Sequence, residues 1–187
     1  MRIVAGQFGG RVLRAPPGAD TRPTSEKVRE ALFAILPDVA GAHVLDLFAG
    51  SGALGLEALS RGAAHATFVD SGKAALAAIR ANLAALGVAD RATVIAGDAV
   101  AVAARLAAAP RSSASPGWSL VTIDPPYASD LAERAASALA RAQLAPGAVI
   151  VIEHDRRHAP PDAIGSLLRT DQRRYGDTFI SFYGVSP

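Results

Sequence analysis

Hydrophobic residues beyond residue 40 fall into short runs that alternate with segments of helical spacing. Five runs are apolar almost throughout and predict buried strands, at residues 44–48, 66–69, 92–96, 118–123 and 148–152. Helical patterns lie between them, at residues 53–61, 71–86, 99–108 and 130–141, and Ser71 is the expected N-cap of the second. Fully apolar strands that alternate with helices are typical of parallel βαβ units with both sheet faces covered. The pattern predicts an α/β fold with a Rossmann-like, doubly wound, mostly parallel sheet.

The C-terminal part of the chain departs from this alternation. Residues 168–175 and 178–183 have strand-like composition and flank Gly176-Asp177. Two strands joined by so short a turn must run antiparallel. We therefore expect an antiparallel strand pair at one edge of the sheet.

The N-terminal part is a small arm. Residues 2–5 and 11–14 are short β-like runs around a glycine-rich segment, which predicts a hairpin. A helix is expected to follow, with Thr24 as its N-cap and its end near residue 36. We divide the chain into this hairpin and helix, residues 1–40, and a main domain, residues 41–187.

Composition narrows the chemistry. The 187 residues include no cysteine, which excludes disulfides, thiolate metal sites and a cysteine nucleophile, and we expect no metal site. No run approaches the roughly 18 to 20 apolar residues of a membrane span. The first residues lack the long apolar core of a secretory signal. We expect a cytoplasmic protein.

Positive charge is concentrated near the N-terminus, although the formal net charge is only +2. The first 36 residues hold six basic side chains and three acidic ones: Arg2, Arg11, Arg14, Arg22, Lys27 and Arg29 against Asp20, Glu26 and Glu30. A basic arm could neutralise the phosphates of a nucleic acid. It could equally be a solvated surface, and the charge pattern leaves both interpretations open.

A glycine turn follows the first strand of the main domain. Gly50, Gly52 and Gly55 have the spacing of the G-x-G-x-x-G fingerprint, and Asp70 ends the second strand 20 residues after Gly50. A dinucleotide site is therefore one interpretation. Asp46, four residues before Gly50, argues against it, since a carboxylate would repel a pyrophosphate and attract an ammonium group.

Four carboxylates stand at the ends of successive strands: Asp46, Asp70, Asp98 and Asp124. In a parallel sheet these ends meet at one edge. Such a crevice suits S-adenosylmethionine, which carries a cationic amine, a sulfonium, a ribose and an adenine amine. The alternative is that strand-end acids cap the following helices, which we expect for one of the four.

The tetrapeptide Asp124-Pro125-Pro126-Tyr127 closes the fourth strand. Its two prolines fix two φ angles and remove two backbone donors, so the peptide is stiff. It offers a carboxylate, outward carbonyls and an aromatic ring. A nucleobase amine needs two acceptors for its N–H groups and a ring to stack on. The motif predicts a site for such an amine, although a plain strand-to-loop turn is the alternative.

These motifs resemble those of class I S-adenosylmethionine-dependent methyltransferases, and more narrowly the bacterial RsmD family. The resemblance covers nearly the whole chain and is clearest over residues 22–33, 45–55, 124–127 and 175–178. The first and last segments are the specific ones. It implies an enzyme that transfers a methyl group from S-adenosyl-L-methionine to the N2 amine of a guanine in small-subunit (16S) ribosomal RNA.

The resemblance also implies residue roles. The turn after the first strand would hold the methionine end, Asp70 the ribose, and Asp98 the adenine. The expected cofactor-binding residues are Asp46, Phe48, Ala49, Gly50, Ser51, Gly52, Asp70, Ser71, Asp98 and Ala99. The expected catalytic residues are Asp124, Pro125, Pro126 and Tyr127, and RNA contacts would fall on Arg2, Arg11, Arg14, Arg22 and Thr24.

Two other functions stay open. An N6-adenine methyltransferase acting on DNA or RNA faces the same chemical problem, but sequence-specific DNA enzymes usually need an added recognition domain. A non-catalytic, cofactor-binding ribosome assembly factor would leave the tetrapeptide idle. So small an enzyme has little surface with which to reshape RNA. We therefore expect a monomer that acts on ribosomal RNA within a small-subunit assembly particle, with no membrane partner.

Overall fold

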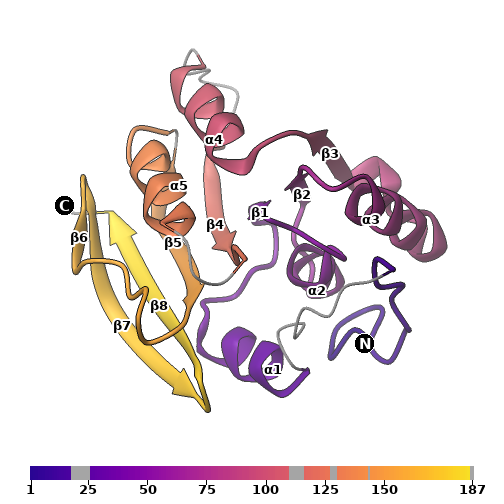
Figure 1. Ribbon diagram of the computed structural model, residues 1–187. Helices are drawn as coiled ribbons and strands as arrows, with labels where there is room; N and C mark the ends of the chain where they lie inside the picture. Colours follow the sequence, from indigo (N-terminus) through magenta and orange to yellow (C-terminus); the bar gives the residue numbers. More distant parts are fainter. Residues whose placement is uncertain (18–25, 110–115, 127–129, 143, 186–187) are drawn as a thin grey trace.

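A single mixed sheet forms the centre of the computed structural model, which describes residues 1–17, 26–109, 116–126, 130–142 and 144–185 (Figure 1). Within these ranges the strand order is β3-β2-β1-β4-β5-β8-β7-β6. The parallel strands are β1 (His43–Leu47), β2 (His65–Asp70), β3 (Ala92–Ala96), β4 (Trp118–Ile123) and β5 (Leu144–His154). The antiparallel strands are β6 (Ala163–Ile164), β7 (Leu167–Tyr175) and β8 (Thr178–Val185). The predicted doubly wound α/β fold is confirmed.

Helices cover both faces of the sheet (Figure 1). On one face lie α1 (Glu26–Ile35), α2 (Ala53–Ser60) and α3 (Lys73–Leu86), and on the other α4 (Ala99–Ala108) and α5 (Leu131–Leu139). A 3₁₀ turn, η1 (Ala89–Arg91), leads from α3 into β3. None of the helices in the described ranges has the length and apolar character needed to cross a membrane.

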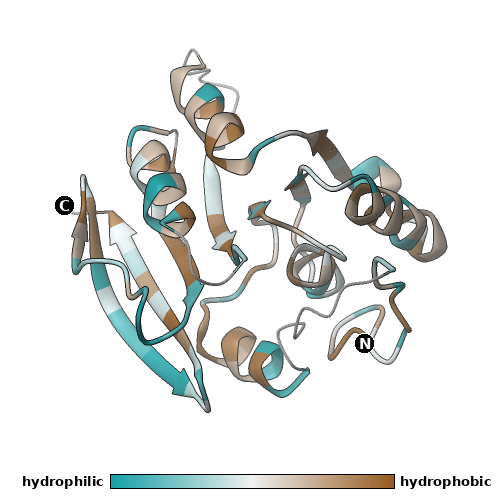
Figure 2. Cartoon of the chain, in the orientation of Figure 1, coloured by the Kyte–Doolittle hydropathy of each residue, from teal (hydrophilic) through white to brown (hydrophobic). Residues whose placement is uncertain are grey.

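Two apolar clusters fill the space between helices and sheet. Successive strand residues point to opposite faces, so Val44 packs with α1, α2 and α3, whereas Leu45 and Leu47 pack with α4 and α5. Burial on both faces explains why the parallel strands are apolar without alternation. Figure 2 shows the contrast with β7, near the sheet edge, which is largely hydrophilic.

The strand order reverses beside β1, which places loops from different parts of the chain together. From β1 the chain moves outward to β2 and β3, then returns to the other side of β1 with β4 and β5. Leu47 lies opposite Val69 of β2 and Ile123 of β4. The segments that follow these three strands therefore meet at one edge of the sheet, the usual ligand position in such folds.

The predicted C-terminal strand pair is present, with Tyr175 opposite Thr178 across the turn and Gly176 at φ 65°. Its position differs from a simple edge pair. β8 pairs with β5, and beyond β7 lies the two-residue strand β6. A strand of two residues is too short to show the alternation that reveals a strand, so β6 could not be predicted.

The N-terminal arm packs on α2. The expected hairpin is reduced to one bridge between Arg2 and Val12, supported by backbone hydrogen bonds such as Ile3 N–H to the Arg11 carbonyl at 2.9 Å. Ile3 and Leu13 are buried in the same apolar cluster as α2. The division of the chain at residue 40 stays a proposal, and the arm shares its core with the main domain.

Candidate functional site

The turn between β1 and α2 has an unusual backbone path. Phe48, Gly50 and Gly52 all have positive φ angles, of 59°, 56° and 79°. The turn is fixed by hydrogen bonds from Ala49 N–H to the Val69 carbonyl at 3.0 Å and from Gly52 N–H to the Ala49 carbonyl at 2.7 Å. A left-handed conformation costs roughly 1–2 kcal/mol for a residue with a Cβ, so Phe48 is held there by its surroundings.

Glycine is required at different positions of this turn for different physical reasons. A Cβ on Gly55 would lie 2.4 Å from the Phe68 ring, and one on Gly52 would lie 3.3 Å from it. These two glycines allow the helix to approach β2. A Cβ on Gly50 would meet only the Phe48 carbonyl oxygen, at 3.9 Å. Gly50 therefore faces open space, where a bound molecule can approach the backbone.

Asp70 connects the turns after β1 and β2. One carboxylate oxygen accepts the Gly50 N–H at 2.8 Å and the other accepts the Gly72 N–H at 2.8 Å. Each oxygen keeps a further acceptor position that can receive a hydroxyl group. Asp70 thus fixes the open turn at Gly50, and the geometry is compatible with the expected ribose contact.

The expected helix caps turned out in opposite ways. Ser71 is exposed and does not cap α3, so that prediction is wrong; Gly72 is the N-cap, and the Asp70 carboxylate takes its amide. Asp98 does cap α4, accepting the Ala101 N–H at 2.8 Å. Asp98 is therefore a strand-end acid with a capping role. Contacts of Ser71, Asp98 or Ala99 with a cofactor stay predictions.

Asp46 lies beneath the turn and not on its surface. Its side chain, 2% exposed, accepts hydrogen bonds from Gly55 N–H at 3.0 Å and from the Thr122 hydroxyl at 2.7 Å. Burial raises the pKa of Asp46 to about 7; the charge of Asp70 acts in the same direction, and the two hydrogen bonds oppose the rise. Asp46 joins β1, β4 and the first turn of α2, and a direct ligand contact stays a prediction.

The Asp124 motif lies beside the β1 turn. Asp124 follows β4, and its N–H approaches the Leu47 carbonyl at 3.5 Å, so the two strand ends are neighbours. The Asp124 side chain is partly exposed, Pro125 is buried and Pro126 is exposed. Tyr127 lies outside the described residues. The structure thus places the Asp124 carboxylate at the point where the strand order reverses.

The arginines expected to contact RNA lie in the N-terminal arm. Arg2 pairs with Glu26 at 3.7 Å, and Arg11 donates to the Ala85 carbonyl at 2.9 Å. Arg14 is exposed. Arg22 and Thr24 lie outside the described residues. Their contacts with RNA stay predictions.

One residue that sequence reasoning missed connects the arm to the cofactor turn. The Asn82 amide donates to the carbonyls of Arg14 and Ser51, at 3.0 Å each, and its oxygen accepts the Arg14 N–H at 2.8 Å. Asn82 is 2% exposed. A polar residue on the apolar stripe of a helix was the available signal, because buried amides require partners.

The donor groups at this end of the sheet fit S-adenosylmethionine. No group of three or more potential metal ligands gathers within the described ranges. The open backbone at Gly50, with Asp70 beside it and Asp124 across the strand reversal, suits a cationic ligand with a ribose. The chemistry of these donors matches the amine and hydroxyl groups of that cofactor.

Comparison with known proteins agrees with this arrangement. The profile of the family described as "Conserved hypothetical protein 95" matches residues 1–184. The "Putative rRNA methyltransferase YlbH" of Bacillus subtilis is 39% identical over 185 residues, covering 98% of each chain. "Ribosomal RNA small subunit methyltransferase D" of Escherichia coli is 39% identical over 163 residues, covering 86% of this chain and 78% of that protein.

Solved structures show the same architecture. The structure of "Putative methyltransferase yhhF" from Escherichia coli superposes with a TM-score of 0.83 at 35% identity, covering 100% of this chain and 98% of that one. A SAM-dependent methyltransferase from Thiobacillus denitrificans, solved with S-adenosyl-L-homocysteine, superposes with a TM-score of 0.57 at 25% identity, covering 73% and 51%. The chain belongs to the Conserved hypothetical protein 95 family, the RsmD and YlbH group of S-adenosylmethionine-dependent methyltransferases.

Proposed function

We propose that this protein transfers a methyl group from S-adenosylmethionine to the exocyclic N2 amine of a guanine in small-subunit ribosomal RNA. The position of Asp124, at the end of β4 and next to the open turn of β1, is the observation that carries the proposal. The likeness to the Escherichia coli small-subunit methyltransferase supports the choice of RNA.

Asp124 and Pro125 make the amine reactive by orienting it. An arylamine nitrogen is a weak nucleophile because its lone pair is delocalised into the ring. The Asp124 carboxylate and the Pro125 carbonyl each accept one N–H of the amine, which localises the lone pair and directs it at the methyl group. Alignment of this kind supplies several kcal/mol of the barrier reduction. Tyr127 stacks on the extruded base, which adds about 1–3 kcal/mol of binding.

Asp124 also stabilises the charge that develops. When bound, S-adenosylmethionine supplies an electrophilic methyl group whose bonding electron pair leaves with the sulfur. As the new N–C bond forms, the amine nitrogen becomes cationic and acidic. The nearby carboxylate stabilises this charge and accepts the proton. No stronger base is required.

The remaining residues have supporting roles. Gly50 and Asp70 hold the methionine and ribose parts, and Asp98 lies near the adenine. The arm with Arg2, Arg11 and Arg14 contacts RNA phosphates. Because the protein has little surface with which to remodel RNA, its substrate is a small-subunit assembly particle, and it acts as a monomer in the cytoplasm.

Labelling with radioactive cofactor tests the proposal. Naked small-subunit RNA, partly assembled particles and mature subunits are incubated with the protein, and the labelled nucleosides are separated. We expect N2-methylguanosine, with the highest yield from partly assembled particles. If the product were N6-methyladenosine, the target base would be adenine and not guanine. If no methyl group were transferred to any RNA, the proposal would be refuted.

A further inference from the structure

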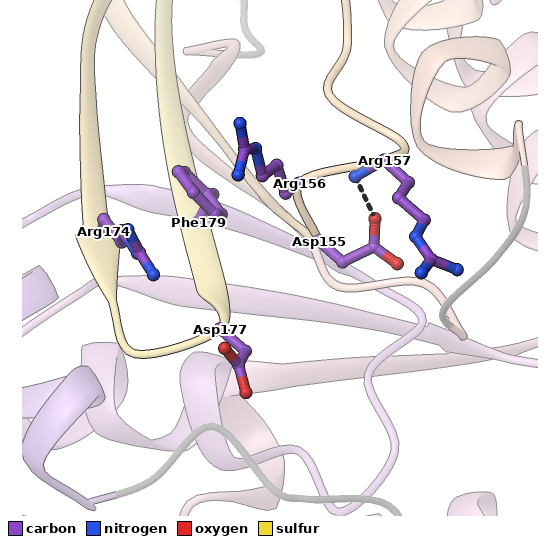
Figure 3. A pocket seen from close by; sticks show the side chains of 6 residues that line it. All are labelled: Asp155, Arg156, Arg157, Arg174, Asp177 and Phe179. Atoms are coloured by element: carbon purple, nitrogen blue, oxygen red, sulfur yellow. Dashed lines mark hydrogen bonds between the residues drawn. The ribbon is translucent and has the colours of Figure 1, made fainter.

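A pocket of about 410 Å³ has a lining that includes none of the candidate site residues described above, and Figure 3 shows the side chains that line it. It is formed where the chain leaves β5 and where the β7–β8 hairpin turns. The lining residues are Asp155, Arg156, Arg157, Arg174, Asp177 and Phe179. Its volume is within the range of roughly 300–1,000 Å³ that is usual for ligand pockets.

Strand register places this pocket at the same sheet edge as Asp124. β5 runs parallel to β4, with Ile152 opposite Ile123, so the residues after His154 emerge next to the Asp124 motif. β8 begins at this edge, since Phe179 pairs with His154. Neighbouring strands are about 4.8 Å apart. The pocket therefore lies one to three strand spacings from β4, beside the target base and not on it.

Three arginines and two aspartates line the pocket, so its positive charge exceeds its negative charge by one. Asp155 is engaged locally, because its carboxylate accepts N–H bonds from Arg157 at 2.7 Å and His158 at 2.9 Å and contacts the His158 ring. In the described part of the chain, the guanidinium groups of Arg156 and Arg157 have no hydrogen bond or ion pair. Figure 3 shows both side chains extending from the segment after β5. Each of these guanidinium groups can bind an anion without breaking an internal contact.

Buried contacts fix the frame of the pocket. The His154 ring bonds to the Asp155 carbonyl through Nδ1 at 2.7 Å and to the Ser181 hydroxyl through Nε2 at 2.9 Å. It also stacks on Phe179, with ring centroids 5.8 Å apart. Burial lowers the pKa of His154, which favours a neutral ring that donates from Nδ1 and accepts at Nε2. The segment carrying Arg156 and Arg157 is thereby tied to β8.

Arg174 and Phe179 add a mixed aromatic and cationic wall. Arg174 donates from Nε to the Gly176 carbonyl at 2.8 Å, which orients its guanidinium. That guanidinium carbon lies 5.6 Å from the Phe179 ring centroid, in cation–π range. Guanidinium groups bind phosphates, and arginine planes and aromatic rings accept stacked bases.

We propose that this pocket binds the phosphate and the adjoining nucleoside of an RNA strand next to the target guanine. The proposal rests on the proposed function, since it assigns the flanking part of the same substrate. A base that is methylated on its amine must leave its stack, and holding the flanking nucleotide steadies the unstacked strand. Arg156 and Arg157 bind the phosphate, and the Arg174 and Phe179 wall packs against the nucleoside.

The test compares two charge-matched double variants. Arg156→Ala/Arg157→Ala removes the two free guanidinium groups. Arg105→Ala/Arg141→Ala removes two exposed guanidinium groups at the other end of the sheet. These arginines lie near the C-terminal ends of α4 and α5, and both helices run away from the carboxyl ends of the strands. Affinity for a short single-stranded RNA is measured by fluorescence anisotropy over a range of salt. We expect weaker binding for the first variant, with the salt slope lower by about 0.7 per lost phosphate contact, and wild-type behaviour for the second.

The aromatic wall is tested separately. Phe179→Leu should weaken RNA binding by about tenfold without changing the salt slope, whereas Phe179→Tyr should bind like the wild type. For Arg156→Ala/Arg157→Ala, the KM for RNA should rise while kcat at saturating RNA and the affinity for S-adenosylmethionine stay unchanged. Thermal unfolding confirms that each variant is folded.

The outcomes distinguish a failure of the pocket assignment from a failure of the proposed function. Methylation of guanine by the wild type, combined with unchanged RNA affinity and KM in Arg156→Ala/Arg157→Ala, would overturn the pocket assignment alone. Loss of affinity for assembled particles but not for RNA would assign the pocket to a ribosomal protein and also overturn it. RNA binding that depends on Arg156 and Arg157, without methyl transfer by the wild type, would support the pocket and refute the proposed reaction.

Discussion

Asn82 donates a hydrogen bond to the carbonyl of Ser51 at 3.0 Å, inside the turn that follows β1. The same amide also holds both backbone groups of Arg14. One buried side chain of α3 therefore connects the N-terminal arm, proposed to meet RNA, with the turn proposed to hold the cofactor. A change in the arm can reach the cofactor turn through this contact.

Asn82→Ala should weaken both the fold and cofactor binding. The change removes three hydrogen bonds to backbone groups, of which the bond to Ser51 is buried and the two to Arg14 are partly buried. A buried group left without its partner costs about 1–3 kcal/mol. We expect the free energy of unfolding to fall by at least about 2 kcal/mol and the Kd for S-adenosylmethionine to rise several-fold. Urea unfolding and calorimetry measure the two effects. Arg80→Ala, on the exposed face of the same helix, is the control, and equal cofactor affinity in the two variants would contradict the connection.

Asp46 should make stability fall as the pH rises. Its pKa in the folded state is about 7, above the unfolded value of 3.8, so the folded state binds more protons between these values and loses stability as the pH rises through them. Asp46→Asn removes this dependence. From pH 5 to pH 8 the variant should gain on the order of 2 kcal/mol relative to the wild type in urea unfolding. Parallel stability curves would contradict this, and Asp90→Asn is an exposed control.

Gly50 and Gly55 should respond differently to a methyl group. Gly55→Ala forces a Cβ against Phe68 and should destabilise the protein by about 1–3 kcal/mol. Gly50→Ala has open space but a φ of 56°, so its stability cost should be about 1 kcal/mol. Its Cβ should instead exclude the cofactor. Calorimetry should find no binding to Gly50→Ala at concentrations that saturate the wild type, and normal binding would mean that the open side of Gly50 is not the cofactor site.

Glu57 should control the attachment of the arm. Its buried carboxylate accepts the N–H groups of Val4 at 2.7 Å and Ala5 at 3.0 Å, and it pairs with Arg29 at 3.5 Å and Arg61 at 2.8 Å. Glu57→Gln removes the charge that balances buried Arg29, which should cost about 3–5 kcal/mol.

Hydrogen exchange measures where Glu57→Gln acts. Amides in the first 17 residues should exchange faster in this variant, and RNA affinity should fall with them. Glu30→Gln, which changes an exposed acid of α1, should leave both unchanged. Unaltered protection of Val4 and Ala5 in Glu57→Gln would show that the arm is held by its apolar contacts alone.

Helices and strands were predicted correctly where their boundaries depend on residues that are close in the sequence. α4 occupies residues 99–108 as expected, because Asp98 caps it and its apolar stripe, with Val102 and Ala103, faces the sheet. β3 likewise agrees at residues 92–96. The edge that gathers Asp70 and Asp124 followed from strand periodicity, since parallel strands deliver their carboxyl ends to one side.

Long-range pairings could not be predicted in this way. A charged residue in a helix is normally assigned to the surface, yet Arg29 and Glu57 are fully buried. They form an ion pair with each other and also bind backbone groups of the arm. Ser71 was predicted to cap α3, but the Asp70 carboxylate accepts the Gly72 N–H at the start of this helix. The pocket with Arg156 and Phe179 joins segments that are distant in the sequence, and the pairing of β5 with β8 brings them together.

Single-turnover methylation by Asp124→Ala tests the central claim most directly. Enzyme saturated with labelled S-adenosylmethionine is mixed with small-subunit particles, and N2-methylguanosine is followed with time, alongside the affinities for cofactor and RNA. Our account predicts no detectable transfer, with both affinities within a few-fold of the wild type, because the carboxylate acts on the amine and not on binding. Transfer at a near-normal rate would contradict it.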